Sequence, residues 1–162
     1  MPVADLYLDT TNSRDVVLQV RARGRQILRN PLANRGTAFT LQERERLDLS
    51  GLLPSRVTTI EEQLRRTYAQ YKRSPSPLAK FIYLSQLRDR NEVLFYRLLS
   101  ENIEELLPII YTPTIGEAIE RFSHEYTSSR GLYLSIDRPD LIEQSLANYV
   151  PDPDEIDLVV VT

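Results

Sequence analysis

The sequence predicts a mainly α N-terminal domain followed by the first strand-helix-strand unit of an α/β domain with a parallel sheet. Apolar residues recur at helical spacing from residue 30 to about residue 126, and after residue 130 they gather in short runs. The final run, residues 157–162, is almost continuously apolar, which is typical of a strand buried on both faces. We therefore expect an extended basic arm over residues 1–29, a helical domain over 30–130 and the truncated start of an α/β domain over 131–162.

The composition excludes several classes of site. The chain has 162 residues, 41% of them hydrophobic and 27% charged, which is ordinary for a globular domain. It has no cysteine, so neither disulfides nor thiolate chemistry can operate, and a cytoplasmic location is expected. A net charge of -3 gives no general attraction to nucleic acid, and no apolar run is long enough to span a membrane. Five glycines form no phosphate-binding loop, and the single histidine, His124, is interpreted as a surface residue.

The arm at the N-terminus carries alternating apolar residues. Leu6-Tyr7-Leu8 and the positions Val16, Leu18 and Val20 predict short strands. Arg23-Gly24 is a candidate hairpin turn leading to an extended segment over residues 26–28. The many arginines of this arm favour a solvated or inter-subunit face over a nucleic-acid or targeting segment.

Helix boundaries can be predicted from capping signals. Thr40 and Glu43 form a capping box, and Thr58 and Glu61 predict a second one at the start of the next helix. Ser74-Pro-Ser-Pro77 predicts a helix break with Pro77 at the first position of a new helix. Residues 91–99 are apolar around so much of their circumference that we expect this helix to be central.

The stretch Pro108-Ile-Ile-Tyr-Thr-Pro-Thr-Ile-Gly116 predicts a rigid turn between two helices. Pro108 should close the first helix, and Thr114 should open the second as a capping box with Glu117. Tyr111 then lies in the turn with its backbone fixed from both sides. Its phenol could be a core or interface group bonded to a carbonyl, or it could be a positioned proton donor.

After this stretch the pattern becomes strand, helix, strand. Residues 131–136 predict a strand, residues 139–147 a helix and residues 157–162 a second strand, joined in a right-handed parallel crossover. Two parallel strands and one helix leave bare edges, so we expect the sheet to continue in further residues or in a partner.

Five ordered blocks together resemble the N-terminal part of the malic enzymes. The resemblance runs from about Asn30 to the last residue and corresponds to about the first third of a family member. Malolactic enzymes share the blocks but carry Tyr-Asp-Pro where this chain has Tyr111-Thr112-Pro113, so the resemblance favours malic enzyme. The blocks are Asn34-Arg-Gly-Thr-Ala-Phe-Thr40, Leu47-x-Leu-x-Gly-Leu-Leu-Pro54, Arg90-Asn-Glu-x-Leu-Phe-Tyr96, the stretch Pro108 to Gly116, and Asp157-Leu-Val-Val-Val-Thr162.

The resemblance implies oxidative decarboxylation of L-malate to pyruvate and CO2, with NAD or NADP as oxidant and Mg2+ or Mn2+ as metal. The family's general acid corresponds to Tyr111. Its lysine base, metal ligands and dinucleotide-binding glycines would follow Thr162, so this segment alone should bind no cofactor and be inactive. The family forms dimers and tetramers, which predicts a homodimer or homotetramer in contact through the helices around Leu64, Phe95 and Tyr96.

A regulatory site is the second implication of the resemblance. Some family members bind fumarate through a glutamine, two arginines and an acidic residue, which correspond here to Gln63, Arg66, Arg90 and Thr58. Two guanidinium groups suit a dicarboxylate, but the threonine departs from the acidic position, and a role of the arginines as ion-pair partners stays open. A non-catalytic helical module for dimerisation or regulation is the alternative function for the whole segment.

Overall fold

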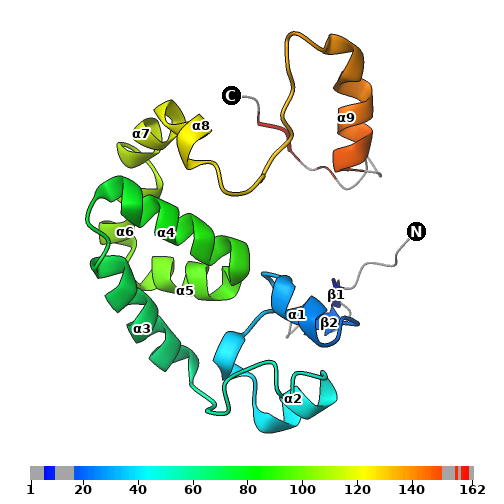
Figure 1. Cartoon of the computed structure of the whole chain (residues 1–162), viewed down its shortest axis with the longest axis vertical. Helices are drawn as coiled ribbons and strands as arrows, with labels where there is room; N and C mark the ends of the chain where they lie inside the picture. Colours follow the sequence, from blue (N-terminus) through cyan, green and yellow to red (C-terminus); the bar gives the residue numbers. More distant parts are fainter. Residues whose placement is uncertain (1–5, 10–16, 151–155, 157, 161–162) are drawn as a thin grey trace. The chain divides into compact units, whose positions relative to one another are not determined.

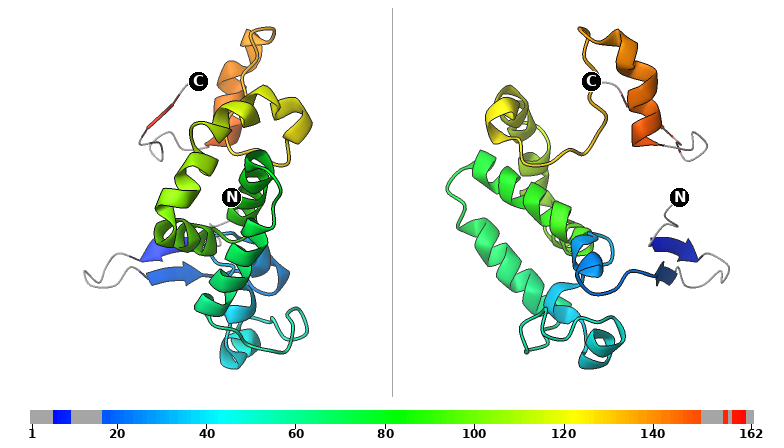
Figure 2. Two further views of the ribbon diagram at one scale, coloured as in Figure 1. Left: turned by 90° about the vertical axis from the view of Figure 1, so that its left-hand side faces the viewer. Right: turned by 45° about the vertical axis from the view of Figure 1, so that its right-hand side comes forward.

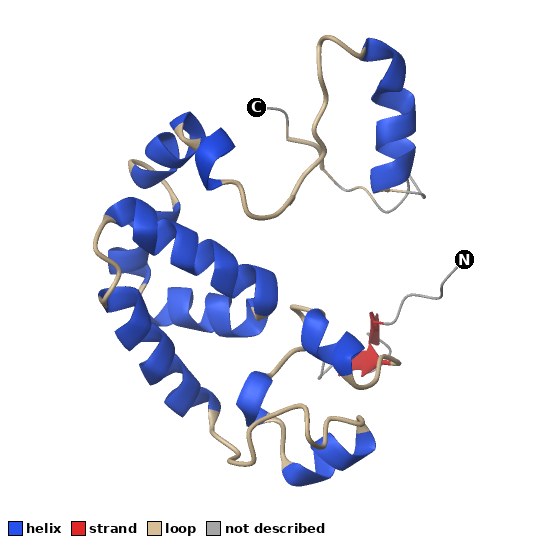
Figure 3. Ribbon diagram, viewed as in Figure 1, coloured by secondary structure: helices blue, strands red, loops and turns tan. Residues whose placement is uncertain are grey.

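The computed structural model describes residues 6–9, 17–150, 156 and 158–160. It divides after Tyr126 into two units, each of which is described here by itself. Helices dominate the first unit, whereas the described part of the second unit is largely loop around one α-helix and one 3-10 turn (Figures 1 and 3). The first unit contains β1 (Leu6–Asp9), β2 (Val17–Val20), α1 (Arg25–Arg29), the 3-10 turn η1 (Gly36–Ala38), α2 (Leu41–Arg46), α3 (Ile60–Lys72), α4 (Pro77–Arg90), α5 (Glu92–Glu101), α6 (Ile103–Ile110), α7 (Thr114–Glu120) and α8 (Phe122–Glu125). The second contains η2 (Pro139–Leu141) and α9 (Ile142–Tyr149).

The two predicted strands of the arm are confirmed as an antiparallel pair in which Leu6 lies opposite Val20. Val16 falls outside the described residues. The predicted hairpin turn at Arg23-Gly24 is wrong, because the following residues form the helix α1. Gly24 adopts a φ of 55° and donates its N–H to the carbonyl of Leu47 at 2.7 Å. Helical geometry then places Ile27 in a small core, where it is 1% exposed.

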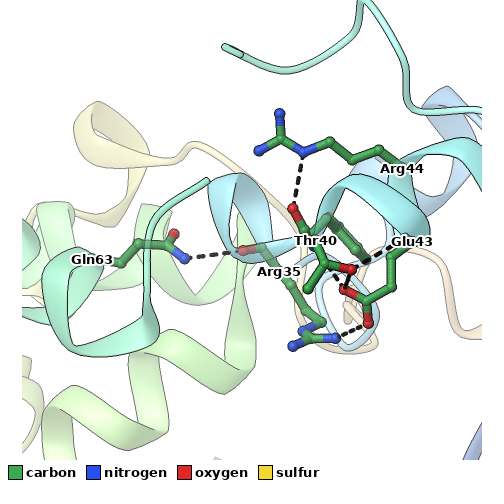
Figure 4. A network of polar contacts seen from close by, with 6 residues as sticks. Arg35, Thr40, Glu43, Arg44 and Gln63 are labelled. Atoms are coloured by element: carbon green, nitrogen blue, oxygen red, sulfur yellow. Dashed lines mark hydrogen bonds and ion pairs between the residues drawn. The ribbon is translucent and has the colours of Figure 1, made fainter. Parts of the chain in front are cut away.

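The small core around α1 and α2 is closed by a buried arginine. Apolar residues supply most of it: Ala22, Ile27, Ala33, Phe39 and Leu49. Beside them Arg44 is only 5% exposed, and its guanidinium donates to five backbone carbonyls, those of Phe39, Thr37, Pro54, Ser55 and Arg56, at 2.6 to 3.4 Å. One cation therefore fixes the chain on both sides of α2, and Figure 4 shows this side chain beside the capping box of the same helix.

The capping predictions succeed at two helices and shift by one residue at a third. The Thr40–Glu43 box opens α2 as predicted, and Ser76 caps α4 with Pro77 in its first turn. At α3 the box uses Thr59 and Glu62 instead of their predecessors. Thr58 lies outside this box, and its hydroxyl is 2.5 Å from that of Thr37.

The main core of the first unit lies among α3, α4, α5 and α6. The central position predicted for residues 91–99 is confirmed, since α5 packs against the other three helices. Figures 1 and 2 show α4 and α5 side by side. Eight buried side chains form this core: Leu64, Tyr71, Leu84, Leu87, Leu94, Phe95, Leu98 and Leu106. The mainly helical part of the predicted fold class is thus confirmed.

The predicted strand-helix-strand unit is not found in the described residues. Residues 139–149 are helical as expected, but residues 131–136 and 158–160 form no strand. Asp157, Val161 and Thr162 fall outside the described residues. A strand satisfies its backbone only by pairing with a neighbour, and here Ile136 and Leu158 are 96% and 80% exposed. Apolar character alone therefore overestimated strand formation in this unit.

Candidate active site

The turn between α6 and α7 holds the predicted acid, Tyr111. The prediction that Pro108 closes α6 is wrong, because the helix continues through it to Ile110. A proline removes one helical hydrogen bond and normally bends or ends a helix. Here Ile109 and Ile110 pack against the main core, and the N–H of Tyr111 still donates to Leu107 at 2.9 Å. Burial of the two isoleucines thus maintains the last turn despite the proline.

Thr114 has a different role from the one its sequence position predicted. It is not a cap in a box with Glu117, because α7 has no side-chain cap and its N-cap position is Pro113. Instead its hydroxyl donates to the carbonyl of Pro108 at 2.8 Å, and the residue is 4% exposed. Glu117 lies beside Arg121, with its carboxylate 3.6 Å from Nε. The turn is therefore closed by a buried hydroxyl bond across the two helices.

The backbone of Tyr111 is held by hydrogen bonds, whereas its side chain is exposed to solvent. Its carbonyl accepts from the N–H of Ile115 at 2.9 Å, and its own N–H is bonded back into α6. The side chain is 64% exposed. A core position for the Tyr111 phenol is therefore wrong for this unit, and the interface alternative stays open. A phenol on a fixed turn that faces outward can reach a molecule bound against the unit.

A charged network that sequence reasoning missed attaches α6 to α3. The carboxylate of Glu105 accepts from the hydroxyl of Tyr68 at 2.6 Å and lies 2.7 Å from the ammonium of Lys72. The hydrogen bond from Lys72, followed by that from Tyr68, lowers the pKa of Glu105. Burial and then the charge of Glu105 raise the pKa of Tyr71 to about 12. The signal in the sequence was the four-residue spacing of Tyr68 and Lys72, which places both on one helix face.

The three predicted regulatory residues line one cavity of about 210 Å³. Gln63 is 3% exposed, and its amide donates to the carbonyl of Arg35 at 3.1 Å (Figure 4). The guanidinium of Arg90 lies 5.9 Å from the ring centre of Tyr83, and Arg66 is exposed. The structure brings the predicted residues together, although the amide of Gln63 is already engaged in holding η1.

Comparisons with known proteins give this geometry its context. The family model for the malic enzyme N-terminal domain matches residues 88–162. NAD-dependent malic enzyme 3 of Bacillus subtilis (strain 168) is 51% identical over 152 residues, which cover 94% of this chain and 26% of the relative. NAD-dependent malic enzyme of Idiomarina loihiensis is 46% identical, over 90% of this chain and 25% of the relative. This sequence belongs to the N-terminal region of the malic enzymes.

The chain spans about a quarter of the length of the malic enzymes that it matches. A putative NAD malate oxidoreductase of Mycobacterium tuberculosis (strain H37Rv) shows the same proportion, with 82% of this chain covering 24% of the relative at 46% identity. The matches extend over the α6–α7 turn and over most of the helical unit. Statements about the activity of a whole malic enzyme are therefore proposals for this segment.

The described residues also limit what this malic enzyme segment can hold. In the part of the chain that the structure describes, no three His, Cys, Asp or Glu side chains gather as a candidate metal site. No helix of the described segments is long and apolar enough to cross a membrane.

The three residues that mark the expected subunit contacts differ in exposure. Leu64 and Phe95 are 5% and 4% exposed, because both side chains belong to the main core of the unit. Tyr96, on the other face of α5, is 53% exposed. Of these three residues Tyr96 is the one with an exposed side chain, and the expected subunit contact through the helices that carry them stays a prediction.

Proposed function

We propose that this chain is the N-terminal segment of an NAD-dependent malic enzyme, in which Tyr111 is the general acid of the oxidative decarboxylation of L-malate to pyruvate and CO2. The observation that carries the proposal is the outward-facing phenol on a hydrogen-bonded turn, 64% exposed. The names of the relatives support malate as substrate and favour NAD over NADP.

The last step of the proposed reaction, protonation of C3 of the product, needs an acid close to that carbon. Once malate has been oxidised and CO2 has left, the product is the enolate of pyruvate, and its C3 must gain a proton as its oxygen becomes the ketone oxygen. A tyrosine carries its proton at neutral pH, so its O–H can break as the C3–H bond forms. The phenolate then recovers a proton from water. Cofactor and metal would be held by other parts of a longer polypeptide, and the proton on Tyr111 is what this segment contributes.

The direct test is Tyr111→Phe in the full-length enzyme, which removes the phenolic O–H and keeps the ring. Loss of a general acid should lower kcat by about 10² to 10⁴-fold while malate still binds. Tyr126→Phe is the matched control, because Tyr126 is also about half exposed and packs edge-on against Phe122. Wild-type turnover of the Tyr111 variant would contradict the assignment.

The segment alone should show no turnover. We expect the 162-residue chain, mixed with L-malate, Mn2+ and either NAD or NADP, to give no reduced cofactor. Reduction in that mixture would refute this expectation. If the full-length protein also fails to oxidise malate, the alternative of a helical dimerisation or regulatory module gains support. Lactate in place of pyruvate as product would favour the malolactic alternative.

A second, regulatory proposal rests on the cavity that Gln63, Arg66 and Arg90 share. We propose that the two guanidinium groups bind a dicarboxylate such as fumarate there. Arg66→Gln in the full-length enzyme should then remove the response of malate turnover to added fumarate. An unchanged response would support the alternative in which these arginines are ion-pair partners at the surface or between subunits.

A further inference from the structure

We infer that Thr114 is a positioning residue for Tyr111, which acts by holding the α6–α7 turn closed. The inference rests on the proposed role of Tyr111 as general acid. Pro108 and Thr114 stand three residues before and three residues after the tyrosine. The hydroxyl of Thr114 donates to the carbonyl of Pro108 at 2.8 Å, so this bond closes the loop that contains the phenol.

The bond satisfies a backbone group that a helix leaves open. The last four carbonyls of a helix have no partner within the helix, and Pro108 stands in the last turn of α6, which ends at Ile110. Thr114, at the first position of α7, supplies a donor to one of them. The residue is 4% exposed, so its side chain has little freedom to leave this arrangement.

The hydrogen bond from the Thr114 hydroxyl differs in kind from the backbone hydrogen bonds of the turn. Tyr111 is bonded through its N–H to Leu107 and through its carbonyl to Ile115, and both are backbone contacts. The bond from Thr114 comes from a side chain, and the choice of residue at this position therefore decides whether it forms. A valine has nearly the shape of threonine but no donor, so it should loosen the turn while it still fills the same space.

Loosening the turn should affect proton transfer more than substrate binding. A displacement of about 1 Å of a catalytic group can cost about 10²-fold in rate. For Thr114→Val in the full-length enzyme we expect kcat to fall by about 10 to 100-fold, with the KM for malate changed by less than about threefold. Thr114→Ser keeps the donor and should restore kcat to within about threefold of wild type, a small loss compared with that displacement.

An isotope effect separates positioning from simple loss of folded enzyme. Malate with deuterium at C2 reports on hydride removal, which precedes protonation of the enolate. If Thr114→Val slows the protonation step, the isotope effect on kcat should fall toward unity. A variant that is only less stable contains fewer active molecules, and those molecules would keep the wild-type isotope effect and KM.

The outcomes distinguish this inference from the proposed function. Thr127→Val is the control, because it makes the same change at an exposed threonine outside the turn. Wild-type kcat for Thr114→Val, together with an inactive Tyr111→Phe, would overturn the positioning role alone. A Ser variant as slow as the Val variant would also overturn it, because the hydroxyl would then not be the cause. An active Tyr111→Phe would instead refute the proposed function.

Discussion

The two units of this chain differ in how their apolar residues are used. In the first unit, Tyr71, Leu84 and Leu106 are fully buried. In the second unit, no described residue is buried, and apolar side chains such as Ile142 and Leu146 remain 39% and 44% exposed. Helices satisfy their backbone hydrogen bonds locally and need only a neighbour to cover one face. Strands need a paired backbone, and the residues expected as strands in the second unit are unpaired, while the apolar side chains of its helix α9 stay partly exposed among the described residues.

The largest expected loss of stability comes from truncating a leucine in the core of the first unit, and the same change in the second unit should cost much less. Leu106→Ala removes a side chain that is 0% exposed, and we expect it to destabilise the first unit by about 2 to 5 kcal/mol. Leu146→Ala in α9 makes the same change at a half-exposed position and should cost less than about 1 kcal/mol. Urea unfolding followed by circular dichroism measures both. Equal losses would mean that the second unit has a core of its own.

Replacing Arg44, the buried cation of the small core, should give the next largest loss of stability. Arg44→Met keeps most of the length of the side chain but leaves five carbonyls of the surrounding loops without their donor. We expect a loss of about 3 kcal/mol, because breaking buried charged hydrogen bonds is costly. The control is Arg46→Met on the exposed part of the same helix. Similar unfolding curves for the two variants would show that the contacts of the guanidinium do not stabilise the unit.

The smallest effect concerns the pH dependence of the link between α6 and α3. The pKa of Glu105 is lowered in the folded state by Lys72 and Tyr68, so the unfolded chain binds the proton more readily. The link therefore stabilises the fold above the ordinary glutamate pKa and loses its contribution as pH falls through the lowered value. Because the pair is partly exposed, we expect less than about 1 kcal/mol. Glu105→Gln should lower the free energy of unfolding at pH 7 and change it little near pH 3. The control Glu104→Gln, at an exposed neighbouring position, should show no such dependence on pH.

The helical unit could be predicted from sequence because its signals are local. The Thr40–Glu43 box and the proline after Ser76 act within one turn, and the structure confirms both. The boundary at α3 moved by one residue: Thr59 caps the helix, and the adjacent Thr58 contacts distant Thr37 instead. A choice between two adjacent threonines depends on a partner that no local pattern specifies.

The turn that carries Tyr111 could be predicted from the sequence, but the hydrogen bonds that close it could not. The turn at Tyr111 between two helices was predicted, but α6 runs through Pro108, and Thr114 closes the turn by bonding to Pro108 and not by capping a helix. That bond depends on α6 continuing through Pro108, which burial of the isoleucines makes possible. The predicted strands of the second unit failed for the opposite reason, because the residues described there supply no neighbour with which to pair.

The most direct test of Tyr111 as the general acid measures proton transfer separately from the oxidation of malate. Full-length enzyme with pyruvate, Mn2+ and reduced cofactor in D2O should exchange the methyl protons of pyruvate for deuterium, because the enolate forms and reverts at the same acid. Proton NMR of the methyl signal measures the rate. We expect Tyr111→Phe to slow this exchange by about 10²-fold or more while Tyr126→Phe leaves it unchanged. Exchange at the wild-type rate in the Tyr111 variant would contradict the role of Tyr111 as general acid.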